Sequence, residues 1–466
     1  MTPTPLHCIV LAAGQGTRMK SARPKVLHGV GGRPMLAHVL TAAQKLGAAT
    51  VHVVYGHGGN AVRAWAEAEA PQALSLHWAH QAEQLGTAHA VQQAMPAIPD
   101  DATVIVMYGD VPLVRASTLT PLVDAGRTGL AVLTTTLEDP AGYGRILRDD
   151  TGAVIGIVEQ RDATPEQQAL REINTGFIAA PAGRLRAWLS KIGNDNAKGE
   201  YYLTDAVALA VADGVRVEAV QAADASEVEG VNDRLQLAHA ERLFQRRQAD
   251  ALMRAGVQFA DPARFELRGA LNHGRDVMID VGCVFEGDVT LDDDVRIGPH
   301  CVLRDVTLGP GTVVEAHSVL EHCSAGAGAR IGPFARLRPG AALGDDVHVG
   351  NFVEVKNVTV GTGSKANHLA YLGDGEVGAG VNIGAGTIFC NYDGANKHRT
   401  VIDDGAFIGS DTQLVAPVRV GRDATVAAGS TITKDVPDGG LTLCRAREQK
   451  HYPNWQRPTK AKRPKP

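Results

Sequence analysis

Aromatic residues make up only 5% of this 466-residue sequence, and its cysteines number six. The cysteines are scattered without a Cys-x-x-Cys pair, which favours reduced thiols in a cytoplasmic protein over a disulfide framework. No stretch approaches the roughly 18 apolar residues of a membrane span, and the first residues lack the cationic start of a signal peptide. The net charge of -5 excludes a strongly basic nucleic-acid-binding protein. We therefore expect a cytoplasmic protein with neither nucleic acid nor a membrane as its partner.

Glycine is the residue that the sequence has in excess, with 52 copies, and this excess indicates many tight turns. Hydrophobic residues at 44% and charged residues at 21% describe a globular chain and not a disordered one. A chain of this length is expected to form two or three domains.

Short apolar runs of β type alternate with alanine-rich helical stretches as far as Arg234. This alternation predicts an α/β domain with a parallel sheet over residues 1–234. The clearest β-type runs are residues 8–11 (CIVL), 51–54 (VHVV), 104–107 (VIVM) and 130–133 (LAVL).

Residues 235–255 then read as one long connecting helix, with Gly256 at its end. One face of this helix is rich in Arg and Gln, and the other is expected to be apolar. The predicted apolar stripe includes Leu235, Ala238, Leu243 and Leu252.

From about residue 276 onward, branched aliphatic residues recur every six positions, often followed by Gly or Asp. A period of six is neither helical nor that of a simple alternating strand, and it predicts a parallel β-helix of triangular coils over residues 256–466. Ordinary β-strands with chance spacing are the alternative, and they do not explain so many repeats. The hexad residues are Ile279, Leu291, Ile297, Leu303, Leu308, Val314, Ile331, Leu337, Leu343, Val349, Val355, Leu372, Val377, Ile383, Ile402, Ile408, Leu414, Val420, Val426 and Ile432.

A glycine-rich turn at residues 11–19 (LAAGQGTRM) follows the first β-type run directly. Its glycines allow backbone N–H groups to approach a phosphate closely, and Arg18 and Lys25 add cations nearby. The turn is neither a Walker loop nor a GxGxxG dinucleotide motif. Taken singly, the two cations are more often solvated surface charges.

Polar residues interrupt the hexads at a few places in the C-terminal half. The spacing from Arg338 to Lys356 equals three hexads, so a coil of that size stacks them on one face as a candidate phosphate site. His368 follows two further hexads on, although a histidine without context is more often a surface or satisfied core residue. Residues 391–397 (NYDGANK) break the rhythm and are expected to leave the solenoid as a loop, where such proteins hold ligands.

Several motifs together resemble the sugar nucleotidyltransferases. These motifs are LAAGQGTRM, PKVL at 24–27, QAEQLGT at 81–87, YGDVPL at 108–113, GYGR at 142–145, Glu159, EINTG at 172–176 and EGVN at 229–232. With the hexapeptide half, the chain resembles the bacterial bifunctional UDP-N-acetylglucosamine pyrophosphorylase/glucosamine-1-phosphate N-acetyltransferases over nearly its whole length. The resemblance implies a Rossmann-like nucleotidyltransferase domain, a connecting helix and a left-handed parallel β-helix. Gln15 departs mildly from the family, in which a cation often occupies that position.

For the N-terminal domain, the resemblance implies transfer of UMP from UTP to N-acetylglucosamine-1-phosphate, with Mg²⁺ held by Asp110 and Asn232. Asp110 follows an apolar strand, where open α/β sheets bind ligands, and Mg²⁺ prefers oxygen ligands. Arg18 and Lys25 are the implied catalytic cations. The implied binding residues for UTP and UDP-N-acetylglucosamine are Leu11, Ala12, Ala13, Gly14, Lys25, Gln81, Gly86, Thr87, Tyr108, Gly109, Asp110, Gly144, Glu159, Asn174 and Asn232.

For the β-helix, the resemblance implies acetyl transfer from acetyl-CoA to glucosamine-1-phosphate, with His368 as general base. The sugar phosphate would be bound by Arg338, Lys356, Tyr371 and Asn382. Acetyl-CoA would be bound by Ala385, Asn391, Tyr392, Ser410, Ala428 and Arg445, with Cys390 a bystander.

The resemblance further implies a homotrimer, and a product that feeds peptidoglycan and lipopolysaccharide synthesis in bacteria. Two alternatives stay open at this point. One is a nucleotidyltransferase whose β-helix serves only oligomerisation or regulation, and the other is a sugar-nucleotide-binding protein that has lost catalysis. The basic tail that contains Arg457, Lys460, Lys462, Arg463 and Lys465 either is solvated or contacts the phosphates of CoA.

Overall fold

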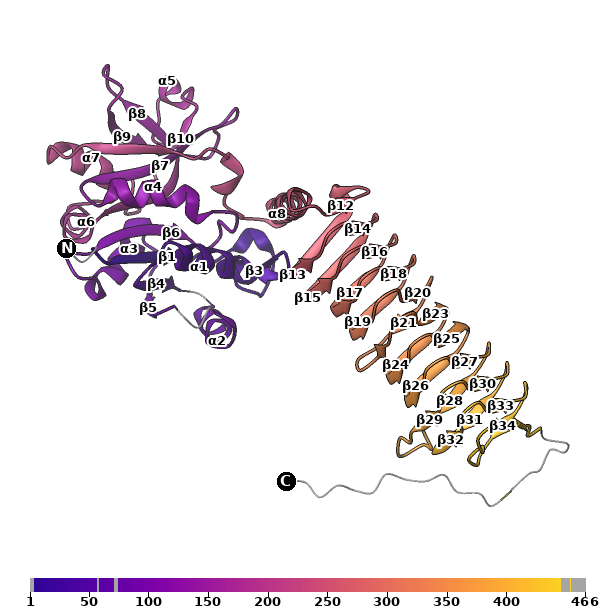
Figure 1. Ribbon diagram of the computed structural model, residues 1–466. Coiled ribbons are helices and arrows are strands. Elements are labelled where there is room, and N and C mark those ends of the chain that lie inside the picture. Colours follow the sequence, from indigo (N-terminus) through magenta and orange to yellow (C-terminus); the bar gives the residue numbers. More distant parts are fainter. Residues whose placement is uncertain (1–3, 57, 71–73, 446–452, 454–466) are drawn as a thin grey trace. The chain divides into compact units, whose positions relative to one another are not determined.

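The chain forms two compact units, which meet within one helix (Figure 1). In the computed structural model, the described residues are 4–56, 58–70, 74–445 and 453. The first unit extends to Phe244 and the second begins at Gln245, so the division falls inside α8 (Arg234–Arg254). The limits 1–234, 235–255 and 256–466 stay a prediction. Among the described residues, no helix combines the length and the apolar character that a membrane span requires.

The N-terminal unit is built on a sheet whose main run of strands is parallel except for one. The order is β11 (Val217–Gln221), β7 (Leu130–Thr136), β10 (Glu172–Pro181), β6 (Thr103–Tyr108), β1 (Leu6–Leu11), β4 (Thr50–Tyr55) and β5 (Leu76–His80), with β8 (Arg145–Arg148) and β9 (Val154–Val158) beside β10. β10 runs antiparallel to both of its neighbours, β6 and β7, so the sheet that was predicted to be parallel is mixed at this strand. The chain enters β10 from the β8–β9 hairpin through α5 (Pro165–Gln168), which is too short for the helical crossover that parallel pairs need.

Helices cover both faces of this sheet, because alternate residues of each central strand enter different apolar clusters. In β1, Ile9 packs with Val91 and Leu185 on one face, whereas Val10 packs with Leu40 on the other. The other helices of this unit are α1 (Met35–Lys45), α2 (Gly59–Glu69), α3 (Thr87–Ala94), α4 (Ala116–Gly126), α6 (Ala182–Leu189) and α7 (Asp205–Ala212), and β2 (Gly29–Val30) pairs with β3 (Arg33–Pro34) as a small ribbon.

The C-terminal unit is the left-handed parallel β-helix that the hexads indicate, and its strands stack in parallel from coil to coil (Figure 1). One sheet has the order β12 (Gln258–Phe259), β14 (Met278–Ile279), β16 (Arg296–Ile297), β18 (Val313–Val314), β20 (Arg330–Ile331), β23 (His348–Asn351), β25 (Lys365–His368), β27 (Asn382–Ile383), β30 (Phe407–Ile408), β33 (Thr425–Val426) and β35 (Leu441–Thr442). The other has the order β13 (Phe265–His273), β15 (Cys283–Leu291), β17 (Val302–Leu308), β19 (Val319–Ala325), β21 (Arg336–Leu337), β24 (Glu354–Val360), β26 (Tyr371–Val377), β28 (Ile388–Cys390), β31 (Gln413–Val415) and β34 (Thr431–Ile432), with β22 (Ala342–Leu343), β29 (Thr400–Ile402) and β32 (Val418–Val420) beside it.

Every hexad residue named from the sequence is buried in one continuous apolar cluster. Ile331 pairs with Val349 in the next coil, three hexads on, whereas the step from Ile383 to its partner Ile408 exceeds four hexads. The longer coil contains residues 391–397, which lie between β28 and β29 outside both strands. The extra residues therefore leave the solenoid without disturbing its register.

The apolar stripe of α8 differs from the predicted one. Leu235 is 84% exposed and Ala238 is also exposed. Leu243 and Leu252 of the predicted stripe are partly buried and pack against the clusters of the first and the second unit, and the fully buried residues of the helix are Ala240, Gln245 and Ala249. Because one helix serves two cores, its buried face is set separately at each end, and a single stripe does not describe it.

Three histidines, His7, His52 and His77, lie side by side on β1, β4 and β5 of the N-terminal sheet. The Nδ1 atom of His7 lies 3.0 Å from Nε2 of His52, and the His52 ring lies 5.1 Å from that of His77. His52 is buried, and among the described residues its Nδ1 has no hydrogen-bond partner. Burial, together with the two neighbouring histidines, lowers the pKa of His52 to about 4.

We predict that His52→Leu makes the N-terminal unit less sensitive to acid. The unfolded chain binds a proton at His52 below about pH 6.5, but the folded chain does so only near pH 4. The contribution of His52 to the free energy of unfolding is therefore fully present above about pH 6.5, and it falls by about 2–3 kcal/mol as the pH approaches 4. Urea unfolding followed by tryptophan fluorescence reports chiefly this unit, which contains three of the four tryptophans, Trp65, Trp78 and Trp188. Equal acid sensitivity in both proteins would contradict the prediction.

Candidate functional site

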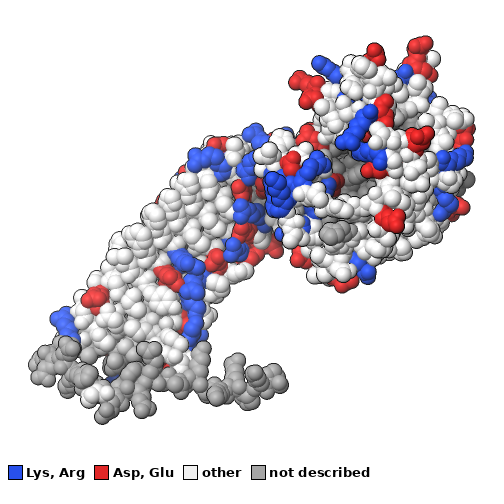
Figure 2. Space-filling view, turned by 180° about the vertical axis from the view of Figure 1, so that it is seen from behind, with Lys and Arg blue, Asp and Glu red and all other residues white. Residues whose placement is uncertain are grey.

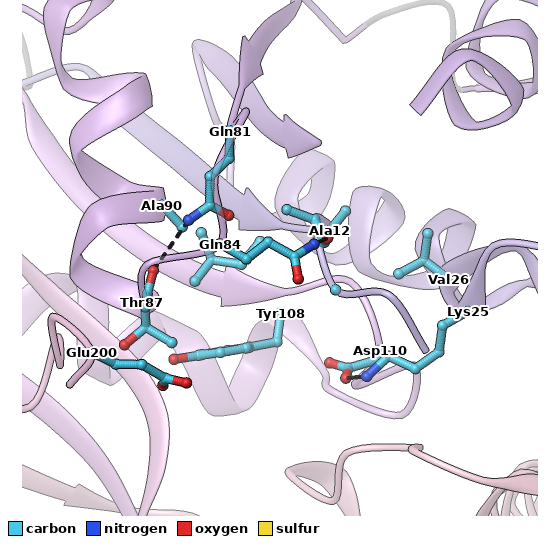
Figure 3. Close-up of a pocket in the computed structure, with 14 residues that line it drawn as sticks. Ala12, Lys25, Val26, Gln81, Gln84, Thr87, Ala90, Tyr108, Asp110 and Glu200 are labelled. Carbon is cyan, nitrogen blue, oxygen red and sulfur yellow. Dashed lines mark hydrogen bonds and ion pairs between the residues drawn. The ribbon is translucent and has the colours of Figure 1, made fainter. Parts of the chain in front are cut away.

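A cavity of about 330 Å³ opens at the carboxyl ends of β1, β5 and β6 in the N-terminal unit (Figure 3). In parallel α/β sheets this edge is where ligands bind. Ten residues expected at the nucleotide line it: Leu11, Ala12, Ala13, Gly14, Lys25, Gln81, Gly86, Thr87, Tyr108 and Asp110. Val26, Gln84, Ala90 and Glu200 complete the lining. Among the described residues, Arg18, Gly109, Gly144, Glu159, Asn174 and Asn232, which were also expected at this site, lie outside the lining.

A lysine ammonium lies between the two oxygen groups expected to hold a metal. Nζ of Lys25 forms an ion pair with the carboxylate of Asp110 (Figure 3). The same Nζ lies 3.2 Å from Oδ1 of Asn232. The backbone N–H of Val231 donates to the carbonyl of Asp110 at 2.9 Å, which ties the two segments together. The side-chain oxygens of Asp110 and Asn232 thus both contact one cation, the Lys25 ammonium. Hard oxygen donors of this kind fit Mg²⁺.

One wall of the cavity depends on a glycine. Gly86 has φ +122°, and a Cβ there would collide with the carbonyl oxygen of Tyr201. The close approach is fixed by Thr87, at the start of α3, whose Oγ1 accepts from the N–H of Leu203. Gln81 then donates from Nε2 to the carbonyl of Gly86 at 3.2 Å. The side chains of Thr87 and Gln81 are therefore each held by a hydrogen bond to a backbone group.

Three of the residues outside the lining form a second group next to it. The N–H of Asn174 donates to the carbonyl of Gly144 at 2.9 Å, and Glu159 accepts from Oγ1 of Thr204 at 3.3 Å. Burial raises the pKa of Glu159. Burial, followed by the charges of Asp110 and Glu159, also raises the pKa of Tyr108, which connects this group to the cavity.

In the C-terminal unit, one corner of the β-helix carries a row of predicted site residues. The Nδ1 atom of His368 lies 2.9 Å from Oδ1 of Asn351, its partner on the neighbouring strand. Hydrogen bonds between successive corners then connect the carbonyl of His368 to Gly386, that of Ala385 to Asp411 and that of Ser410 to Gly429. His368, Ala385, Ser410 and Ala428 therefore follow one another along this corner, and Arg445 donates to the carbonyl of Ala428.

A second group gathers around Asp374, a buried carboxylate on β26. Its oxygens accept from Nζ of Lys356 at 3.2 Å, from Nδ2 of Asn357 at 2.9 Å and from Nδ2 of Asn391 at 2.6 Å. Burial alone would raise the pKa of Asp374, but these donors lower it below its ordinary value.

The other expected sugar-phosphate residues divide between this group and the other sheet. Nδ2 of Asn391 lies 3.5 Å from the hydroxyl oxygen of Tyr371. Nη1 of Arg338 donates to Oε1 of Glu354 at 2.7 Å. Asn382 instead lies on β27, in the sheet that contains β25 and His368. Tyr392 is 55% exposed and donates to the carbonyl of Gly394.

Sequence reasoning did not name as site residues Val26, Gln84, Ala90 and Glu200 of the cavity, nor Asn351, Asn357 and Asp374 of the β-helix. Gln84 stands inside the QAEQLGT motif, and Asp374 follows Lys356 by three hexads, so spacing offered a signal for both. The tail residues Arg457, Lys460, Lys462, Arg463 and Lys465 lie outside the described residues.

Comparisons with known proteins divide the chain in the same way. Residues 8–172 match the MobA-like NTP transferase domain family, residues 268–368 the GMPPB C-terminal domain family and residues 399–434 the bacterial transferase hexapeptide family. The protein named bifunctional protein GlmU from Alkalilimnicola ehrlichii is 61% identical, over 97% of this chain and 96% of its own. Proteins of the same name from Marinobacter nauticus and Paraburkholderia phytofirmans are 54% and 57% identical, each over 98% of this chain and all of its own.

We predict that Asp374→Ala destabilises the C-terminal unit by about 2–4 kcal/mol, because it leaves the Lys356 ammonium and two amides without their acceptor. The loss is complete at neutral pH, since the lowered pKa keeps Asp374 ionised there, and it shrinks only below about pH 4. Calorimetric unfolding measures it. Asp294→Ala is the matched control, because Asp294 shares the positive φ, at 61° against 52°, but is exposed. Equal destabilisation by both changes would refute the role of the ion pair.

Proposed function

The chain belongs to the family of bifunctional GlmU proteins, and from this premise we propose how its two units divide two reactions. The protein is a bifunctional enzyme. It transfers acetyl from acetyl-CoA to glucosamine-1-phosphate, and it transfers UMP from UTP to the resulting N-acetylglucosamine-1-phosphate. UDP-N-acetylglucosamine and pyrophosphate are the final products, and cell-wall synthesis is the process that this family serves. UTP and acetyl-CoA are its co-substrates.

The observation that carries the uridylyl site is the Lys25 cation, which contacts Asp110 in the lining of the cavity and Asn232 beside it. Asp110 and Asn232 would hold Mg²⁺, which when bound neutralises charge on the phosphates. The glycine-rich turn at residues 11–14 presents backbone to the nucleotide, and Lys25 and Arg18 stabilise the charge that develops on the phosphates. An oxygen of the sugar phosphate attacks the α-phosphorus of UTP in line, and the bond to pyrophosphate breaks.

The acetyl site is proposed at the corner that carries His368. Its imidazole takes a proton from the amine of glucosamine-1-phosphate as the nitrogen attacks the acetyl carbonyl, and the CoA thiolate leaves. Arg338, Lys356, Tyr371 and Asn382 bind the sugar phosphate. Ala385, Ser410, Ala428 and Arg445 follow along the acyl-donor side, and Asn391 and Tyr392 approach the sugar or acetyl group from the inserted loop.

Two observations support a homotrimer in which neighbouring copies complete this site. Among the described residues of one chain, no hydrogen bond or ion pair joins His368, which bonds to Asn351, to the Lys356–Asp374 group. The corner that carries His368 also exposes Phe334, Phe352 and Leu369, and the rings of Phe334 and Phe352 stack 5.3 Å apart. Figure 2 shows, in addition, broad areas of the β-helix without charged side chains. An exposed apolar row of this kind is typical of an interface between copies. The enzyme would act in the cytoplasm, where UTP and acetyl-CoA are found.

The test of the two-reaction assignment is mass spectrometry of the purified protein with glucosamine-1-phosphate, acetyl-CoA, UTP and Mg²⁺, with each component omitted in turn. UDP-N-acetylglucosamine is expected only in the complete mixture. If it formed only from ready-made N-acetylglucosamine-1-phosphate, the β-helix would serve oligomerisation or regulation alone.

Asp110→Asn and His368→Ala should separate the two activities. Asp110→Asn is expected to lower uridylyl transfer more than about 100-fold, since it removes the charge opposite Lys25, and to leave acetyl transfer unchanged. His368→Ala should do the reverse, with a loss of about 10²–10⁴ in acetyl transfer. Separate assays of both reactions on each variant measure this, and a parallel loss of both activities in either variant would sink the assignment.

Phe334→Ser combined with Phe352→Ser is expected to weaken the trimer about tenfold or more, because the exposed stack loses its apolar area. Sedimentation velocity across a concentration series measures the shift toward smaller species. Phe407→Ser is the control, since Phe407 is 48% exposed like Phe334 but lies on β30 and not at the corner. If only the control dissociated the protein, the interface would lie on the flat sheet.

A further inference from the structure

Asn351 is the one residue whose side chain the structure joins to His368 by a hydrogen bond within the described part of the chain. Oδ1 of Asn351 lies 2.9 Å from Nδ1 of His368. The two residues face each other in the register of β23 and β25, and the N–H of Leu369 donates to the carbonyl of Asn351 at 3.0 Å. Asn351 is thus held by the ladder itself, directly beside the imidazole.

The backbones of the two strands lie close together at this point. A Cβ on Gly350 would overlap the carbonyl oxygen of Asn367, so a residue larger than glycine does not fit there. On the other side, Phe352 and Leu369 turn the corner with φ of +56° and +50°. Asn351 and His368 are therefore the last residues before the same turn in successive coils, and their side chains leave the strands together.

The chemistry of the amide sets the state of the imidazole. A carboxamide oxygen only accepts hydrogen bonds, so the Nδ1 atom that faces it carries the ring proton. In the neutral ring the lone pair then resides on Nε2. An amide also adds no charge, whereas a carboxylate in its place would stand close to the anionic substrates that the proposed function brings to this corner.

We propose that Asn351 is the positioning residue of the acetyl-transfer reaction, a role that rests on the proposed function of His368. Asn351 selects the tautomer in which Nδ1 is protonated, and it fixes the ring so that Nε2 faces the substrate amine. The residue touches neither substrate in this arrangement and acts only through His368.

The test compares Asn351→Ala and Asn351→Asp with wild type in steady-state acetyl-transfer assays across pH. Asn351→Ala should lower kcat about five- to tenfold with little change in KM, as expected for one lost hydrogen bond to the base. Asn351→Asp keeps an acceptor at Nδ1 and should recover most of kcat. Its carboxylate should also shift the acid limb of the kcat/KM profile to higher pH, because a negative charge favours the protonated ring. An unchanged profile in Asn351→Asp, or an unchanged kcat in Asn351→Ala, would overturn the proposal.

A double-mutant comparison distinguishes failure of this inference from failure of the proposed function. If Asn351 acts through His368, then Asn351→Ala has no further effect on the residual rate of His368→Ala. An equal loss in both backgrounds would mean that Asn351 acts independently of His368, and the inference would be wrong. Full acetyl transfer by His368→Ala itself would instead refute the proposed function.

Uridylyl transfer by the same proteins controls for folding, and Asn272→Ala, at an exposed asparagine on β13, is the matched control for loss of an amide. Both are expected to stay at the wild-type level. If Asn272→Ala lowered acetyl transfer as much as Asn351→Ala, loss of β-helix stability would explain the effect, and the positioning role would be refuted.

Discussion

The inward stacking of one aliphatic side chain above another, coil after coil, is the interaction on which the C-terminal unit depends. Hexad residues such as Ile331 and Val349 lie in register in one continuous core. Since each coil must place its aliphatic residues over the last, the corners between them are also forced into rows. The packing of this core therefore aligns His368, Ala385, Ser410 and Ala428, which do not belong to the core themselves.

The N-terminal site rests on a different constraint, the meeting of strand ends. Asp110 follows β6 and the glycine-rich turn follows β1, so a carboxylate and a backbone surface for phosphate come together from neighbouring strands. Asn232 belongs to a segment far later in the chain, and the hydrogen bond from the N–H of Val231 to the carbonyl of Asp110 holds it near Asp110. The Lys25 ammonium balances the resulting oxygen pair.

The sequence allowed much of this to be predicted, for physical reasons that differ between the units. The period of six is visible because every inward position obeys the same packing rule. The reversed direction of β10 and the exposed Leu235 were not visible, because each depends on what the element packs against and not on its own pattern. Ten of the expected nucleotide residues line the cavity, and several of the rest form a group beside it. Asn351 escaped notice because the coil that leads from it to His368 falls one position short of three hexads, so their pairing follows only from the actual register.

The coil with the inserted loop has a consequence for how such a corner changes in evolution. The step from Ile383 to Ile408 is longer than the coils before it, yet the strands on either side still stack as neighbours. Successive strands lie about 4.8 Å apart whatever the length of chain between them. The length of ligand that fits along the corner therefore changes only when an entire coil is gained or lost. A new loop alters the surroundings of the ligand and leaves that length unchanged.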